Sequence, residues 1–137
     1  MAQTAEPCVP GLFSSDGGGR VFGSRCVACG TPYFPRLSTC HNPACPGSRM
    51  ESCEFGGRGK VWSYSVADFP PPSPHKYDQP FKPYAIAVVD LDSGLRLVGQ
   101  MVDPPAAMSV GATVELVIDT LYHERDQAFT TWKFKLA

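Results

Sequence analysis

The sequence predicts a mainly β protein in which a small metal-binding ribbon precedes a five-stranded barrel. Three observations lead to this prediction. Two pairs of cysteines follow each other closely in the first third of the chain, and short strand-like segments recur at regular intervals after residue 56. In addition, 14 prolines and 13 glycines among 137 residues favour short strands and turns over long helices.

The cysteine pairs have the spacings C-x2-C, Cys26 to Cys29, and C-x4-C, Cys40 to Cys45. Two such loops bring four thiolates together, and Zn²⁺ takes four of them tetrahedrally in a closed structural site. Gly30 supplies the tight turn after the first pair. We therefore expect a zinc ribbon. Iron on the same sulfurs, the rubredoxin arrangement, is the alternative; zinc is favoured because neither pair has the Cys-Pro-x-Cys-Gly form.

The segments around the cysteines complete the ribbon, which we place at residues 21–55 after an N-terminal arm at 1–20. We expect the first ten residues to be loosely held. The expected ribbon strands are 20–25, 31–35 and 50–55. A ribbon this short buries little apolar surface, so the metal would supply much of its stability. The remaining cysteines, Cys8 and Cys53, have no neighbouring base or motif and are interpreted as ordinary thiols.

The barrel is expected at residues 56–137, where no segment is long enough for a confident helix. The expected strands are 60–66, 84–90, 95–102, 113–119 and 129–136. Asp92-Ser93-Gly94 is a hairpin turn between the second and third. Five short antiparallel strands point to a closed barrel, for which the OB-fold is the commonest design. Trp62, Tyr64 and Trp132 follow the strand alternation and are expected in the core.

One long segment, residues 69–83, joins the first two barrel strands. Its six prolines deny it the donors of a strand and hold it extended. Loops of this length are usually functional or disordered, and this one lies at the mouth where OB-folds bind ligands. We expect Phe69, His75, Tyr77 and Phe81 to contact a partner; a rigid solvent-facing spacer is the alternative. His75 has no nucleophile or carboxylate placed with it, so we expect no catalytic residue in this chain.

Charge argues against nucleic acid as the partner. Residues 54–137 hold eight Lys and Arg against ten Asp and Glu, without the positive stripe that phosphate binding needs. A single-strand-binding OB-fold protein therefore remains only an alternative. No apolar run approaches the length of a membrane span, so no membrane partner is expected. With no secretory signal at the N-terminus, we expect a reducing cytoplasm and cysteines that bind metal rather than form disulfides.

The order of these parts resembles a family of zinc-ribbon and OB-fold proteins long catalogued as a domain of unknown function. The resemblance covers residue 21 to the C-terminus. It rests on Cys26 to Gly30, Pro35-Arg36, the second cysteine pair, the segments 57–66 and 83–91, and Val110-Gly111. Family members are partners of thiolase-superfamily enzymes. The resemblance thus implies a non-catalytic subunit in a complex that makes or breaks carbon–carbon bonds in acyl-CoA thioesters.

Members of that family include partners of acetoacetyl-CoA thiolase with hydroxymethylglutaryl-CoA synthase, of sterol side-chain aldolases, and of benzoylsuccinyl-CoA thiolase in anaerobic toluene breakdown, and the sequence resembles the last of these. The resemblance also implies CoA or acyl-CoA at the interface with the catalytic subunit. Basic residues near the barrel mouth are then candidates for CoA phosphates: Arg58, Lys60, Lys76 and Lys82. Two features depart from the family. The C-x4-C pair is usually C-x2-C, which leaves His41 and Cys53 as substitute ligands, and the helical arm before the ribbon is nearly absent.

Overall fold

The structure, a computed structural model, describes residues 5–14, 19–45, 49–72 and 76–137. Within these ranges the strands form two mainly antiparallel sheets. The smaller sheet has the order β3-β2-β4, and the larger has the order β1-β9-β7-β6-β5-β8 with a further β8–β9 pairing. The strands are β1 Glu6–Pro7, β2 Arg20–Cys26, β3 Pro32–Tyr33, β4 Met50–Gly56, β5 Arg58–Ala67, β6 Tyr84–Leu91, β7 Arg96–Met101, β8 Thr113–Glu124 and β9 Gln127–Leu136.

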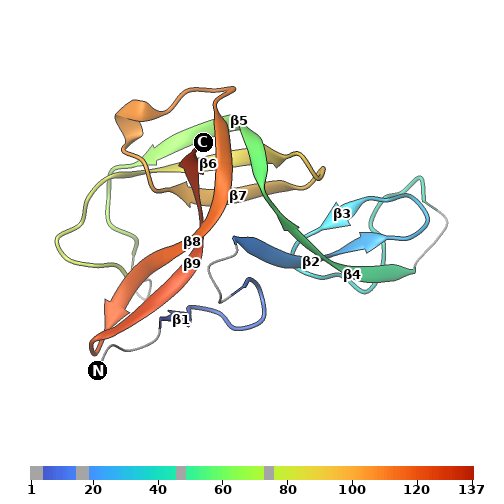
Figure 1. The fold of residues 1–137 in the computed structure, drawn as a ribbon, viewed down its shortest axis with the longest axis horizontal. Coiled ribbons are helices and arrows are strands. Elements are labelled where there is room, and N and C mark those ends of the chain that lie inside the picture. Colours follow the sequence, from blue (N-terminus) through green and yellow to red (C-terminus); the bar gives the residue numbers. More distant parts are fainter. Residues whose placement is uncertain (1–4, 15–18, 46–48, 73–75) are drawn as a thin grey trace.

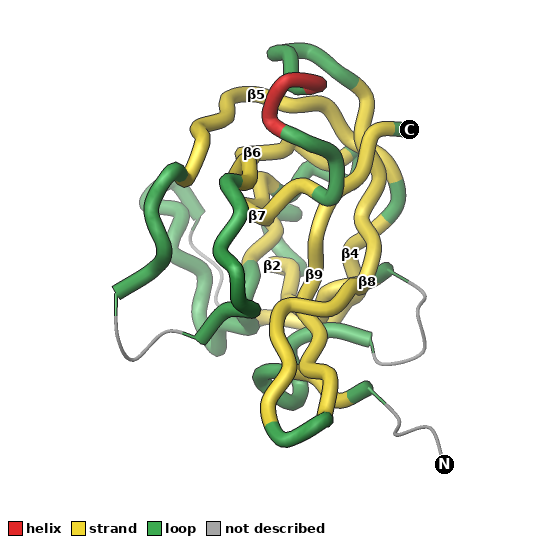
Figure 2. Tube along the Cα trace, turned by 90° about the vertical axis from the view of Figure 1, so that its left-hand side faces the viewer, coloured by secondary structure: helices red, strands yellow, loops and turns green. Residues whose placement is uncertain are grey.

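The larger sheet closes into the predicted five-stranded OB-fold barrel. β5 pairs with β6 and β8, β6 with β7, and β8 with β9, all antiparallel, while β7 and β9 pair in parallel and complete the circle. Closure leaves none of these five strands as a free edge. Figure 1 shows the barrel on the left and the smaller sheet on the right, and Figure 2 looks across the barrel strands. The fold class predicted from the sequence is confirmed.

β8 extends well beyond its predicted end at residue 119, β9 begins slightly before its predicted start at residue 129, and the two project from the barrel as a hairpin (Figure 1). Their turn consists of Arg125 and Asp126, with φ of 53° and 63°. Two positive-φ residues are the mark of a type I′ turn, whose twist matches that of the strands it joins. Sequence patterns find such turns through Asn-Gly or Asp-Gly, and Arg125-Asp126 lacks the glycine. The hairpin therefore escaped prediction.

The ribbon and the barrel share one hydrophobic core. Val21 of β2 and Phe55 of β4 are fully buried and belong to the same cluster as Val89 and Phe134 of the barrel. Burial of apolar surface is the dominant stabilising term in folding. The ribbon is thus held by packing on the barrel as well as by any metal, which the expectation of a mainly metal-stabilised ribbon did not foresee.

The expectation of a loosely held N-terminus is wrong for its described residues. Glu6 and Pro7 form β1, which pairs in parallel with β9, and the backbone N–H of Cys8 donates to the carbonyl of Thr130 at 2.9 Å. Phe13 is 3% exposed and forms an isolated bridge with Val21. The arm is therefore attached to both sheets, although its sequence has no strand periodicity.

The expectation that three aromatic residues lie in the core is also mostly wrong. Trp62 is 55% exposed and Tyr64 is 36% exposed, while Trp132 is only partly buried. Gly59 and Val61 of β5 are buried, so alternation places Lys60 and Trp62 on the outside, and a β-bulge then shifts the register between Val61 and Ser63. A bulge inserts one extra residue, so alternation on its two sides no longer belongs to the same face.

The only helical element among the described residues is the single 3-10 turn Pro105–Ala107 between β7 and β8. This agrees with the expectation that no segment of the barrel is long enough for a confident helix. Within the described ranges, no helix has the length and apolarity needed to cross a membrane.

Candidate metal centre and barrel face

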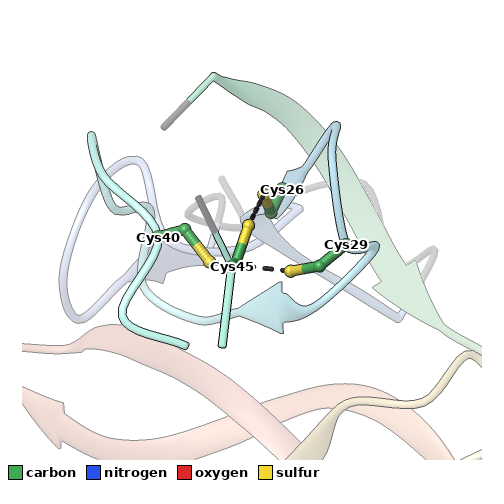
Figure 3. Close-up of side chains that lie close together, drawn as sticks. All are labelled: Cys26, Cys29, Cys40 and Cys45. Carbon is green, nitrogen blue, oxygen red and sulfur yellow. Dashed lines mark hydrogen bonds between the residues drawn. The ribbon is translucent and has the colours of Figure 1, made fainter. Parts of the chain in front are cut away.

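Four cysteines converge between the two loops of the ribbon. The Sγ atoms of Cys26, Cys29, Cys40 and Cys45 all lie within 4.8 Å of one another. Figure 3 shows the side chains pointing towards a common centre, with Cys26 and Cys45 as one pair and Cys29 and Cys40 as the other. The paired sulfurs are 3.7 Å and 3.6 Å apart, far beyond a disulfide bond. Tetrahedral Zn–S bonds of about 2.3 Å place sulfurs about 3.8 Å apart. The geometry therefore fits a four-thiolate metal site.

Neighbouring groups prepare the sulfurs for metal binding. The Cys29 Sγ lies 3.0 Å from the hydroxyl of Thr31, and this contact, with further hydrogen bonds, lowers the pKa of the thiol to about 6. The backbone N–H of Asn42 donates to the Sγ of Cys40 at 3.5 Å. Thiolates are the metal-binding form of cysteine, and hydrogen bonds to sulfur stabilise them. The lowered pKa of Cys29 therefore favours the thiolate, the form that binds metal.

The wide C-x4-C loop still brings Cys45 into the cluster. Neither of the proposed substitute ligands, His41 and Cys53, belongs to it. Asn42 closes the loop: its Oδ1 accepts from the N–H of Ala44 at 3.0 Å, and its carbonyl accepts from the N–H of Cys45 at 3.0 Å. His41 is exposed, with its ring edge-on to Tyr33. Cys53 lies on β4 and packs against the core. Among the described residues, the cluster contains only the four predicted cysteines.

The proline-rich loop folds back onto the barrel. The rings of Tyr77 and Phe81 meet edge to face at 5.9 Å, and Phe81 meets Tyr84 of β6 at 6.1 Å. Phe69 differs from these residues, because its side chain is 82% exposed. Of the predicted partner contacts, Tyr77 and Phe81 are thus half-buried, and Phe69 is presented to solvent. His75 lies outside the described residues.

One ion pair and one aspartate–histidine contact connect the loop to the β8–β9 hairpin. Lys76 donates to Glu124, which raises the pKa of the amine and lowers that of the carboxyl. Asp78 accepts from the backbone N–H of His123 at 2.7 Å and lies 2.7 Å from its Nδ1. Partial burial raises the pKa of Asp78, but these two contacts outweigh it and the net pKa is lowered. Sequence reasoning missed Glu124 and His123 because it did not find the hairpin.

The basic residues proposed for CoA phosphates fall into two separate pairs. Lys76 and Lys82 line one pocket beneath the proline-rich loop. Arg58 and Lys60 lie at the beginning of β5, where Lys60 pairs with Asp90 in register. The pocket instead borders Tyr84, which pairs with Ala67 at the other end of β5. A single anion cannot meet all four side chains.

Comparison with known proteins identifies both halves of the chain. Residues 19–51 match a family model described as the ChsH2 rubredoxin-like zinc ribbon domain, and residues 53–119 match the ChsH2 C-terminal OB-fold domain. A DUF35 domain-containing scaffold protein of Methanocaldococcus jannaschii is 35% identical over 117 residues, covering 84% of this chain and 79% of that protein.

Two further relatives are parts of enzyme complexes. The benzoylsuccinyl-CoA thiolase subunit BbsA of Thauera aromatica is 32% identical over 130 residues, covering 92% of this chain and 85% of that protein. A chain of the Ltp2-ChsH2(DUF35) aldolase superposes with a TM-score of 0.61 and 32% sequence identity, over 85% of this chain and 84% of that chain. The relatives therefore share both modules in the same order.

Proposed function

Because this chain belongs to the DUF35 family of zinc-ribbon and OB-fold proteins, we propose that it is a zinc-binding, non-catalytic subunit of a thiolase-type complex acting on acyl-CoA thioesters. One observation carries the proposal: both modules align together with a thiolase subunit and with a chain of an aldolase complex. The partner would be a thiolase-superfamily catalytic subunit. Its carbon–carbon bond chemistry would take place on that subunit.

Zinc is the metal we propose for the four-cysteine cluster. The family model that covers the cluster describes a zinc ribbon, and the sulfur spacing suits a tetrahedral ion. A metal held by four thiolates cross-links the two loops and has no open position at which to activate water. Cys26, Cys29, Cys40 and Cys45 would thus fix the shape of the ribbon, a structural rather than catalytic role.

Phe69 is our candidate for a partner anchor on the barrel side. A large aromatic side chain that is 82% exposed on a loop is a typical centre of a protein interface. Tyr77 and Phe81 would act indirectly, by holding the loop against Tyr84. Of the four basic candidates, Lys82 is the one that could meet a single CoA phosphate, because Lys76 is paired with Glu124 and Arg58 and Lys60 lie at the other end of β5.

The finer assignment concerns the substrate. The alignment with BbsA, over 92% of this chain, supports benzoylsuccinyl-CoA or a similar aryl acyl-CoA as the substrate of the complex. The DUF35 scaffold relatives align at comparable identity, so the substrate is determined by the catalytic partner rather than by this chain. Isolation of the complex, followed by thiolysis assays with benzoylsuccinyl-CoA and with acetoacetyl-CoA, would identify the substrate.

Reconstitution with the catalytic subunit tests the proposed role. We expect the two chains to co-purify and the pair, but neither chain alone, to turn over acyl-CoA. Deletion of residues 69–83, or Phe69→Asp alone, should lower turnover of the pair. Val110→Asp is the matched control, since Val110 is 67% exposed on another loop. Unchanged kinetics and assembly in the Phe69 variant would contradict the assignment of this anchor.

The two alternatives give different results in the same preparation. A single-strand-binding OB-fold protein would bind oligonucleotides with an affinity that falls steeply with added salt. A rubredoxin-like electron carrier would contain iron and be coloured, whereas a zinc protein is colourless. Metal analysis combined with co-purification therefore separates all three functions.

A further inference from the structure

A continuous groove runs along the outer surface of the barrel beneath the proline-rich loop. It consists of a pocket of 320 Å³ under the loop and an adjoining one of 210 Å³ over β6, β7 and β9. The two pockets share Gln100 and Leu121. Small-molecule sites are concave, mostly apolar and about 300–1,000 Å³ in size. The groove reaches that size and has the loop as a wall.

The inner part of the groove is almost entirely apolar. Its lining includes Ile86, Val98, Leu121 and Trp132, and Val98 is 52% exposed. The indole N–H of Trp132 donates to the carbonyl of Val98 at 2.8 Å, so this ring has no free donor to offer a ligand. An exposed apolar groove of this kind favours an apolar ligand group, because burying it removes both surfaces from water.

A β-bulge places Leu121 in the groove. In the β8–β9 pairing Thr120 faces Thr130 and Tyr122 faces Phe129, which leaves Leu121 as the extra residue. Bulges are often found where a strand aims a side chain at a functional site. Leu121 contributes to both pockets and therefore lies at the junction between the apolar part and the mouth.

The mouth of the groove has one lysine without an anionic partner among the described residues. Lys76 is paired with Glu124, and Asp78 is paired with His123. Lys82 also lines the mouth, is exposed, and has no ion pair or hydrogen bond within the described ranges. Aromatic rings of Tyr77, Phe81 and Tyr84 surround these groups. The mouth thus favours a single anionic group attached to an apolar body.

We propose that this groove binds a small amphipathic carboxylate, with the carboxylate at Lys82 and an alkyl or aryl-alkyl group along Val98, Leu121 and Trp132. The single cation selects a monoanion over a polyphosphate or a nucleic acid strand, which require several cations. This site is separate from the proposed partner anchor Phe69 but shares Lys82 with the CoA-phosphate candidates, and its ligand is expected to bind without the catalytic subunit. The full chain alone is sufficient for binding.

Methyl NMR spectra of the full chain test this proposal with four probes: octanoate, 4-phenylbutyrate, octylammonium and acetate. The first two should saturably shift the methyl signals of Ile86, Val98 and Leu121 and leave those of Leu97 and Val89, inside the barrel, unchanged. Octylammonium should bind at least about tenfold more weakly because attraction at Lys82 becomes repulsion. Acetate should not bind, since it has no apolar body.

Variants locate the site. Leu121→Glu should abolish octanoate binding, and Lys82→Ala should weaken it about fivefold, the upper range for a solvent-accessible ion pair. Lys60→Ala removes the same charge at the other end of β5 and should have no effect. Unchanged interior methyl signals verify that each variant is folded. Equal binding of octylammonium, binding that survives Leu121→Glu, or shifts produced only by the catalytic subunit would overturn the proposal, the last by making this face a protein interface.

Discussion

The guanidinium group of Arg25 joins the ribbon to Ser93 in the barrel, 68 positions further along the chain. One nitrogen donates to the carbonyl of Gly30 in the first cysteine loop at 2.7 Å, and the other donates to the carbonyl of Ser93 in the β6–β7 turn at 3.1 Å. The same group lies 5.7 Å from the centre of the Phe55 ring. Arg25 therefore links the candidate metal loop, the shared core and a barrel turn.

Removing this link should loosen the ribbon from the barrel. We expect Arg25→Ala to lower the free energy of unfolding by about 1–2 kcal/mol, the sum of two partly exposed hydrogen bonds. Hydrogen exchange should also accelerate at the amide of Gly94. Arg36→Ala is the matched control, because Arg36 stands over the Phe22 ring within the ribbon. Equal effects of the two substitutions would show that Arg25 has no special role between the modules.

The second prediction concerns whether Cys45 or Cys53 is the fourth ligand of the metal. Cys45→Ser should reduce bound zinc from one ion per chain to near zero and lower the melting temperature, because the cluster loses a thiolate. Cys53→Ser should retain the full zinc content, since Cys53 packs on the core and is not in the cluster. Elemental analysis of both purified variants decides between them. Full zinc in Cys45→Ser and loss in Cys53→Ser would reverse the assignment.

The Asp78–His123 contact predicts a dependence of stability on acid. The pKa of Asp78 is below its ordinary value of 3.8 in the folded chain. A carboxyl with a lowered pKa stabilises the fold above its unfolded pKa, and this contribution is lost as the pH falls through the folded pKa. The loss should therefore occur below about pH 4. Above about pH 4, the contact between Asp78 and His123 holds the proline-rich loop on the β8–β9 hairpin.

Asp78→Asn tests this contribution through urea unfolding at pH 7 and at pH 3. The variant should be less stable than the wild type at pH 7, and the difference should shrink at pH 3. Asp68→Asn serves as a control on the same connection between β5 and β6, since Asp68 is exposed. A difference that is the same at both pH values would mean that ionisation of Asp78 does not contribute.

Residue spacing was sufficient to predict the cysteine cluster and the barrel. Four cysteines in two short loops are typical of a metal site. Cys26 and Cys45 could therefore be predicted to lie together although the second loop is wide. The barrel followed from five apolar segments of strand length. Both inferences depend on patterns that are local in the sequence, which is why they could be made without coordinates.

Features that depend on one extra residue could not be predicted in this way. The bulges at Trp62 and Leu121 interrupt the regular pairing of β5 and β8, and nothing in the neighbouring residues marks them. The same applies to the turn at Arg125, which tertiary pairing holds at positive φ without a glycine. The groove depends on Leu121 and on that hairpin, so it became visible only in the structure.

The last prediction concerns Gly59, where β5 lies between two neighbouring strands. It pairs with Leu91 of β6 and with Val114 of β8. A Cβ atom there would lie 2.5 Å from the carbonyl oxygen of Asp90 and 2.8 Å from a methyl group of Val89. Backbone cannot yield as a flexible side chain can, so the strands would have to separate.

We therefore expect Gly59→Ala to lower the free energy of unfolding by about 1–3 kcal/mol, as overpacked cores usually do. Urea unfolding followed by circular dichroism measures this change. Ser65→Ala, on the same strand but exposed, should change stability by less than about 0.5 kcal/mol. If Gly59→Ala were as stable as the wild type, β5 would have room to move away from β6. The close approach of these strands would then not limit the sequence at this position.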